Sequence, residues 1–169
     1  MTPRWQSLQD ELQQSRPFRS RREELFLALL RTAAVVRRPV AKVVEDHGLS
    51  LAQYNVLRIL RGAGAEGLPT LAIRERMIEE AAGITRLIDK LEASGFVRRE
   101  RDASDRRQVY CRITEAGTRL LVDVDPHLVS AIDTALSHVE GGEQDGLLAL
   151  LAEVRAGACP PKTNSSQGA

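Results

Sequence analysis

The sequence has few aromatic residues, few cysteines and no long apolar run, and each scarcity excludes a class of protein. Aromatic residues make up 4% of the 169 residues, too few for the stacking platforms that hold single-stranded nucleic acids. The two cysteines, Cys111 and Cys159, are widely separated and indicate neither a disulfide framework nor a zinc site. No stretch approaches the ~20 apolar residues of a membrane span, and no signal peptide opens the chain. We therefore expect a reduced cytoplasmic protein with no membrane partner.

Signatures of catalysis are also missing. The three histidines, His47, His127 and His138, follow no metal-ligand or catalytic-triad pattern, and no glycine-rich phosphate loop occurs. The sequence therefore predicts a protein that is not an enzyme and that uses no metal or cofactor.

Charge is distributed unevenly, although the formal net charge is only +1. Residues 1–69 carry 11 basic and 7 acidic side chains, whereas residues 115–169 carry 3 and 8. Between them, residues 96–113 hold 6 arginines against 3 acids. A polyanionic partner would favour the middle of the chain, although a solvated charged hairpin would have the same composition.

Apolar spacing and capping residues predict mainly α structure. Residues 1–19 form a polar extension, in which 3–15 could make a short amphipathic helix with Trp5 on its apolar side. Ser20 and Glu23 have capping-box spacing and begin a long helix to about residue 46, kinked at Pro39. Ser50 begins a second helix, with Tyr54, Leu57 and Leu60 on its buried side and Gly62 and Gly64 at its end.

The following elements are shorter. We expect helices over about 70–77 and 80–94, then strands over 96–101 and 107–114 joined by a turn. Two short helices, a longer one and an arginine-rich hairpin form the pattern of a winged helix-turn-helix. Thr114 then begins a helix to about residue 140, interrupted near Pro126, and another helix covers about 143–155. The tail, residues 157–169, is expected to be disordered.

The helix over 80–94 is the candidate for reading DNA. Its apolar stripe contains Ala81, Ile84, Leu87, Ile88 and Leu91, and the opposite face carries Glu79, Ala82, Arg86 and Asp89, flanked by Gly83, Thr85 and Lys90. In a helix-turn-helix the N-terminal part of this outer face enters the major groove. There Thr85 can donate to a base or phosphate, Arg86 can reach a guanine edge or a phosphate, and Ala82 and Gly83 allow close approach.

The turn of the hairpin, residues 102–107, places an acid beside arginines. Arg106 and Arg107 follow Asp105 directly. An arginine at such a tip can enter the narrow minor groove, and a neighbouring carboxylate can hold the guanidinium in place.

Several runs of residues together resemble the MarR family of bacterial regulators over about residues 20–156. They are Leu49 to Leu57, Gly83 to Glu92, Gly95 to Val97, Asp105 to Arg107, and Ile113 to Gly117. The resemblance implies a winged helix-turn-helix over 49–114, flanked by dimerisation helices over 20–47 and 115–156. It also implies Arg107 as the minor-groove arginine and Asp105 as its buttress.

The function that the resemblance implies is transcriptional regulation, with repression as the expected sign. The chain would bind a palindromic operator in double-stranded DNA as a homodimer, and a small aromatic or phenolic effector could release it. The predicted DNA-contacting residues are Ala82, Gly83, Thr85, Arg86, Lys90, Asp105, Arg106 and Arg107. One departure from the family pattern concerns specificity, since Glu79 and Glu80 stand where many members have a serine cap and small hydroxyl residues.

Two alternatives remain open from the residues alone. Cys111 lies between Val109 and Ile113 in a strand alternation and should point inward, but Cys111 or Cys159 could serve a redox sensor. A winged helix can also mediate protein contacts, which Glu79, Glu80 and Asp89 favour and the arginines oppose.

Overall fold

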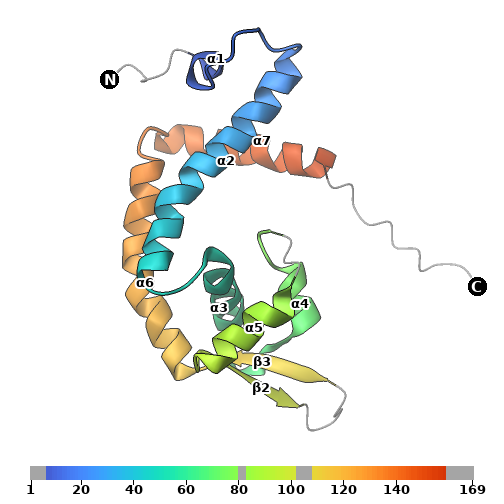
Figure 1. The fold of residues 1–169 in the computed structure, drawn as a ribbon, viewed down its shortest axis with the longest axis vertical. Helices are drawn as coiled ribbons and strands as arrows, with labels where there is room; N and C mark the ends of the chain where they lie inside the picture. The colour runs from blue at the N-terminus through green and yellow to red at the C-terminus, as the bar shows by residue number, and fades with distance from the viewer. Residues whose placement is uncertain (1–6, 80–82, 102–107, 159–169) are drawn as a thin grey trace, which may run out of the picture. The chain divides into compact units, whose positions relative to one another are not determined.

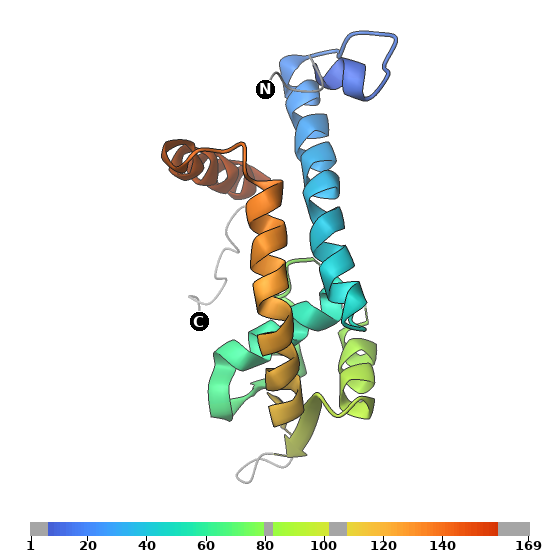
Figure 2. The same cartoon turned by 90° about the vertical axis from the view of Figure 1, so that its left-hand side faces the viewer.

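The structure, a computed structural model, describes residues 7–79, 83–101 and 108–158. The chain divides into two compact units, Met1–Ile132 and Asp133–Ala169. Within its described residues, the first unit contains the long helix α2 (Arg21–Asp46), most of the long helix α6 (Glu115–Ala135), four shorter α-helices and a small sheet. Figures 1 and 2 show these elements. This arrangement confirms the predicted fold class, mainly α with a β-hairpin wing.

The N-terminal helices begin with hydroxyl caps. In α1 (Leu8–Glu11) the Ser7 side chain accepts the backbone N–H of Asp10, so the helix is shorter than the predicted 3–15, and Trp5 lies outside the described residues. In α2 (Arg21–Asp46) Ser20 accepts the Glu23 N–H at 3.1 Å. The Glu23 carboxylate accepts the N–H of Arg19 at 2.6 Å, one residue before the position in a standard capping box.

Helix α3 (Leu51–Ala63) begins with a complete capping box formed by Ser50 and Gln53. Its predicted buried residues are confirmed: Tyr54, Leu57 and Leu60 are in the core. The helix ends at Gly64, whereas Gly62 lies inside it, because only Gly64 adopts a positive φ. A 3-10 turn, Gly64–Glu66, leads to β1 (Leu68–Pro69) and α4 (Thr70–Glu75).

The candidate recognition helix, α5, covers Ile84–Ala93, so the predicted start at residue 80 is wrong. Gly83 precedes the helix with φ +111°, a conformation that a residue inside a right-handed helix cannot have. Of the predicted apolar stripe, Ile84, Ile88 and Leu91 are buried and Leu87 is partly buried, while Ala81 lies outside the described residues.

The sheet has three antiparallel strands in the order β1-β3-β2. The predicted hairpin is formed by β2 (Val97–Arg101) and β3 (Val109–Ile113), with Val97 opposite Ile113. The strand β1 was not predicted, since two residues, one of them proline, carry no alternation; Leu68 pairs with Cys111.

The last two helices differ from their predicted bounds. Thr114 caps α6 (Glu115–Ala135) by accepting the Gly117 N–H at 3.1 Å, and its hydroxyl donates to the Gly95 carbonyl at 2.7 Å. The helix continues through Pro126, because the loss of one N–H donor is offset by packing of its buried face, and it ends before residue 140. Helix α7 covers Gly141–Ala158, so Gly157 is helical; residues 159–169 of the predicted tail lie outside the described residues.

One hydrophobic core holds the first unit together. Val44 of α2, Leu57 of α3, Ile73 of α4, Ile88 of α5 and Leu121 of α6 are all fully buried in it. Each of these large apolar side chains contributes about 1.5–3 kcal/mol to folding by leaving water. The core therefore fixes α5 against α3 and α4, with its opposite face toward solvent.

Candidate nucleic-acid interface and adjoining cavity

The outer face of α5 carries the predicted contact residues within the described part of the chain. Thr85, Arg86 and Lys90 are exposed, and exposed Gly83 precedes them. Ile84, Ile88 and Leu91 anchor the opposite face in the core, so these three polar side chains are presented on one rigid element. The remaining predicted residues, Ala82, Asp105, Arg106 and Arg107, lie outside the described residues.

Ion pairs to neighbouring elements neutralise two of the acidic residues near this face. Arg37 of α2 lies 3.1 Å from the Glu79 carboxylate, and Arg99 of β2 lies 2.6 Å from that of Asp89. By contrast, neither Arg86 nor Lys90 forms an ion pair with any described residue. The face is therefore more positive than its count of acids and bases indicates.

Arg99 connects β2 to α5 through two carboxylates. Its guanidinium reaches Asp89 at 2.6 Å and Glu92 at 2.6 Å, and Glu92 also accepts the Arg99 backbone N–H at 3.2 Å. Partial burial alone would lower the pKa of Arg99, but the hydrogen bonds and charges of Asp89 and Glu92 outweigh it and raise that pKa. The strand and the helix thus share a charged junction.

Two other arginines of the hairpin strands also form ion pairs within the chain. Arg98 and Arg112, which face each other across the two strands, lie 2.8 and 2.9 Å from the Glu100 carboxylate. This pairing offsets the repulsion expected between like charges on adjacent strands. Part of the arginine excess that the sequence shows over 96–113 is therefore structural.

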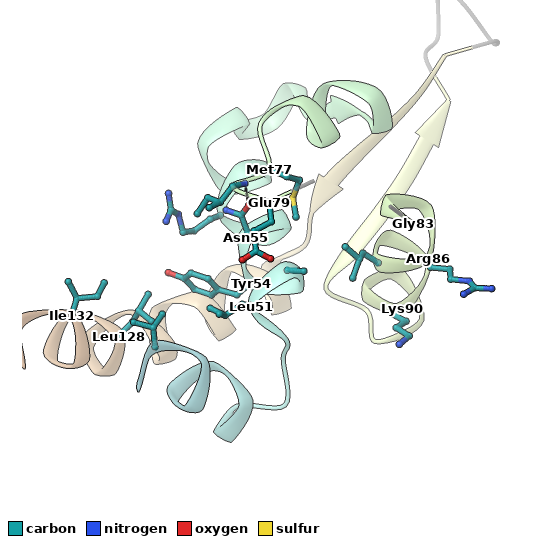
Figure 3. A pocket seen from close by; sticks show the side chains of 15 residues that line it. Leu51, Tyr54, Asn55, Met77, Glu79, Gly83, Arg86, Lys90, Leu128 and Ile132 are labelled. Atoms are coloured by element: carbon teal, nitrogen blue, oxygen red, sulfur yellow. Dashed lines mark hydrogen bonds between the residues drawn. The ribbon is translucent and has the colours of Figure 1, made fainter. Parts of the chain in front are cut away.

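A cavity of about 640 Å³ adjoins α5 in the first unit. Its apolar wall comes from Val40, Leu51, Ala52, Met77, Ile78, Leu87, Leu128 and Ile132. The other lining residues are Tyr54, Asn55, Arg58, Glu79, Gly83, Arg86 and Lys90. In Figure 3 the Arg86 and Lys90 side chains extend from α5 away from Tyr54, so their stems rather than their charged ends border the cavity. A volume of this size suits a small organic ligand.

Tyr54 links the cavity wall to α6. Its hydroxyl donates to Asp125 at 3.1 Å, and Arg61 binds the other oxygen of the same carboxylate at 2.6 Å. Burial raises the pKa of Tyr54, and the nearby charge of Asp125 and their hydrogen bond raise it further. The phenol is therefore neutral at physiological pH and holds α3 against α6.

The sequence does not predict which residues line this cavity. Its lining comes from α2, α3, the connection between α4 and α5, α5 and α6, which no local pattern brings together. One feature of the sequence could have indicated a polar group in this region. Asn55 interrupts the apolar run from Tyr54 to Leu57, all of which is buried.

Cys111 is fully buried in β3, as predicted, whereas Val109 is 37% exposed rather than inward-facing. Burial raises the pKa of the Cys111 thiol, which disfavours the reactive thiolate. Cys159 lies outside the described residues.

The sequence profile of the MarR family matches residues 49–109, from the α3 cap to the hairpin. The chain is 34% identical over 107 residues to the HTH-type transcriptional regulator YkoM of Bacillus subtilis (strain 168), covering 63% of this chain and 68% of that protein. It is 31% identical over 114 residues to MhqR of the same organism, covering 68% and 77% of the two chains.

The chain belongs to the MarR family. It is a DNA-binding transcriptional regulator of the winged-helix type, as predicted from the sequence. A MarR transcription factor from Planctomyces limnophilus has a similar structure, with TM-score 0.62 and 35% identity over 80% of this chain and 98% of that one.

Two further solved structures of similar fold were determined with bound molecules. Sco3205 of Streptomyces coelicolor, in complex with DNA, matches with TM-score 0.75 and 21% identity, covering 89% of this MarR-family chain and 96% of its own. CouR of Rhodococcus jostii RHA1, bound to p-coumaroyl-CoA, matches with TM-score 0.68 and 26% identity, covering 86% and 98%.

Within the described ranges, no helix is both long and apolar enough to cross a membrane. Nor do the histidine, cysteine, aspartate and glutamate side chains of these ranges form a group that could hold a metal ion.

Proposed function

We propose that this chain is a homodimeric repressor that binds a palindromic operator, with α5 in the major groove and Arg107 in the minor groove. The observation that carries the proposal is the charge arrangement on α5. Arg86 and Lys90 carry no ion pair within the described residues, while Glu79 and Asp89 beside them lie within ion-pair distance of Arg37 and Arg99. Free cations on a rigid helix face suit phosphate and guanine contacts.

The beginning of α5 supports the same orientation. Gly83 provides no side-chain cap, so the first N–H groups of the helix have no hydroxyl or carboxylate from that position. Such N–H groups, together with the helix dipole, favour an anion such as a DNA phosphate. Thr85 and Arg86 lie in the first turn, where a recognition helix contacts bases.

Exposed apolar residues in each unit support dimerisation. In the first unit, α2 exposes Leu25, Phe26, Leu30 and Val35. In the second, α7 exposes Leu147, Leu148, Leu150 and Val154. Surfaces of this kind are typical of protein interfaces. A two-fold dimer would present two recognition helices to half-sites about 10 bp apart.

The cavity supports control by a small aromatic or phenolic effector. Its lining includes the cation Arg58 and one acid, Glu79, which pairs with Arg37. Arg86 and Lys90 contribute only their apolar stems, because their charged ends extend away from the cavity. The largely apolar wall suits an aromatic ring, and Arg58 suits a negative charge carried on that ring. An occupant would touch α5 itself, and a shift of α5 would weaken the contacts with DNA.

The proposal is tested by selecting fragments of genomic DNA that the purified protein binds, then footprinting them. We expect two-fold symmetric sites, affinity that falls steeply with salt, and a dimer of twice 18.6 kDa by light scattering. Transcription in vitro from a selected promoter should decrease when the protein is added. The double variant Arg86→Ala, Lys90→Ala should lose binding, whereas the control Arg119→Ala on α6 should keep it. Footprints without symmetry, or a monomer that binds DNA fully, would contradict the proposal.

A further inference from the structure

Asn55 is a polar side chain placed where the fold is otherwise apolar. It is 7% exposed, and it is the single polar residue in the buried set of the described ranges. Burying an amide without a hydrogen bond is costly, so its partner is informative. That partner is the backbone N–H of Ile78, which donates to Asn55 Oδ1 at 3.1 Å across 23 residues of sequence.

Ile78 lies in the connection between α4 and α5, directly after Met77, which packs against the core. The Ile78 side chain is 77% exposed, so packing does not fix it. The next residue, Glu79, pairs with Arg37, but both side chains are more than half exposed, and such surface pairs contribute little. The bond to Asn55 is therefore the buried polar anchor of the connection.

The position of this anchor relates it to the recognition helix. Asn55, Ile78, Glu79 and Gly83 line the same cavity, and Gly83 immediately precedes α5. Figure 3 shows Asn55 beside Met77 and Glu79, on the side of the cavity opposite Gly83. Because Asn55 belongs to α3, this bond ties Ile78, which precedes α5 in the chain, to a core helix.

We propose that Asn55 is a positioning residue for DNA recognition, which sets the path of the α4–α5 connection by holding the Ile78 N–H. The inference rests on the proposed function in taking α5 as the helix that reads DNA. Its role is distinct from core packing, since what matters is an acceptor atom at the Oδ1 position rather than the apolar volume of the side chain.

Two substitutions separate the acceptor from the packing. Asn55→Asp keeps an oxygen at the same place but buries a carboxylate, which lowers thermal stability. Asn55→Leu is apolar and of similar length, so it suits the core but leaves the Ile78 N–H without its acceptor. The control Ile78→Ala removes an exposed side chain and keeps the N–H.

Hydrogen–deuterium exchange at the Ile78 amide and DNA affinity are measured on the full chain, at a temperature where all variants are folded. In Asn55→Leu we expect exchange at Ile78 to be at least tenfold faster and DNA affinity to be about tenfold lower. In Asn55→Asp and Ile78→Ala both quantities should stay within about threefold of the wild-type values, although Asn55→Asp melts at a lower temperature.

Two results would overturn the inference: an unchanged exchange rate at Ile78 in Asn55→Leu, or DNA affinities that follow melting temperature, with Asn55→Asp the weaker binder. The failure of the proposed function looks different. In that case the wild-type chain itself would select no DNA, whereas the exchange measurement would still report whether Asn55 holds Ile78.

Discussion

The guanidinium of Arg99 in β2 lies 2.6 Å from the carboxylate of Asp89 in α5, and this contact joins the β2–β3 hairpin to α5. Glu92, one helical turn further, binds the same guanidinium. Because the two carboxylates stand three residues apart on one helix face, a single arginine serves both. Asp89 and Glu92 of α5 are thus both paired with a strand of the hairpin.

We expect Arg99→Ala to lower the free energy of unfolding by about 1–2 kcal/mol, since hydrogen bonds to two charged groups are lost while both side chains stay near the surface. Arg99→Lys should lose less, because one ammonium can still reach a carboxylate but cannot span both. Urea denaturation measures the difference. Arg101→Ala, an exposed neighbour on the same strand, is the matched control and should change stability by no more than about 0.5 kcal/mol. If Arg99→Ala and Arg101→Ala changed the free energy of unfolding equally, the stabilising role of the Arg99 ion pairs would be contradicted.

Close packing near the start of α6 requires a glycine at position 117. A Cβ at that position would overlap the carbonyl oxygen of Phe96, which belongs to the backbone and cannot move aside alone. We therefore expect Gly117→Ala to destabilise the protein by more than about 1 kcal/mol, as overpacking does. Gly146→Ala in α7 meets no atom within 4 Å and should be neutral, or stabilising by up to about 1 kcal/mol through helix propensity. Thermal melts of the two variants should therefore shift in different directions.

Much of the fold could be predicted because several helices begin at capping residues that bond to backbone groups only a few positions away. Ser20, Ser50 and Thr114 cap helices through their own side chains, so a few adjacent residues suffice to place them. The start of α5 could not be placed in this way, because the apolar spacing continues back to Ala81 while Gly83 adopts a positive φ that a helical residue cannot have. Strand β1 depends on pairing with β3, a contact between distant residues.

The candidate site likewise has features that local sequence predicts and features that depend on tertiary contacts. The exposed face of α5 follows from helical periodicity, which correctly separates Thr85, Arg86 and Lys90 from the buried stripe. The cavity and the Asn55–Ile78 bond require tertiary structure, since they join elements far apart in sequence. Likewise, charge counting cannot tell that Arg37 and Arg99 neutralise Glu79 and Asp89.

Thiol chemistry offers a further prediction. Burial raises the pKa of Cys111, so the thiolate fraction stays small until the pH exceeds that raised value. We expect iodoacetamide to label Cys111 at pH 7.5 only as fast as the protein unfolds, and rapidly in denaturant, as peptide mass spectrometry would show. Cys111→Ser and Cys159→Ser should bind DNA like the wild type, with and without peroxide. A peroxide-induced loss of binding that either substitution abolishes would instead support a redox sensor.

The final prediction separates the two elements proposed to contact DNA. If Arg107 enters the minor groove, Arg107→Ala should weaken binding by about 1–3 kcal/mol, with a loss that depends on the A·T content at the flanks of the site. Asp105→Ala should cause a milder form of the same defect, because the arginine remains but loses its buttress. Arg86→Ala should act differently: it should relax sequence preference at one position in each half-site if Arg86 reads a guanine, or weaken all sites equally if it holds a phosphate. Affinity and thermal stability are measured together for all three variants, with Arg119→Ala as the control. An Arg107→Ala variant that binds with wild-type affinity would exclude the minor-groove role, and one that binds poorly only because it unfolds would make Arg107 a structural residue.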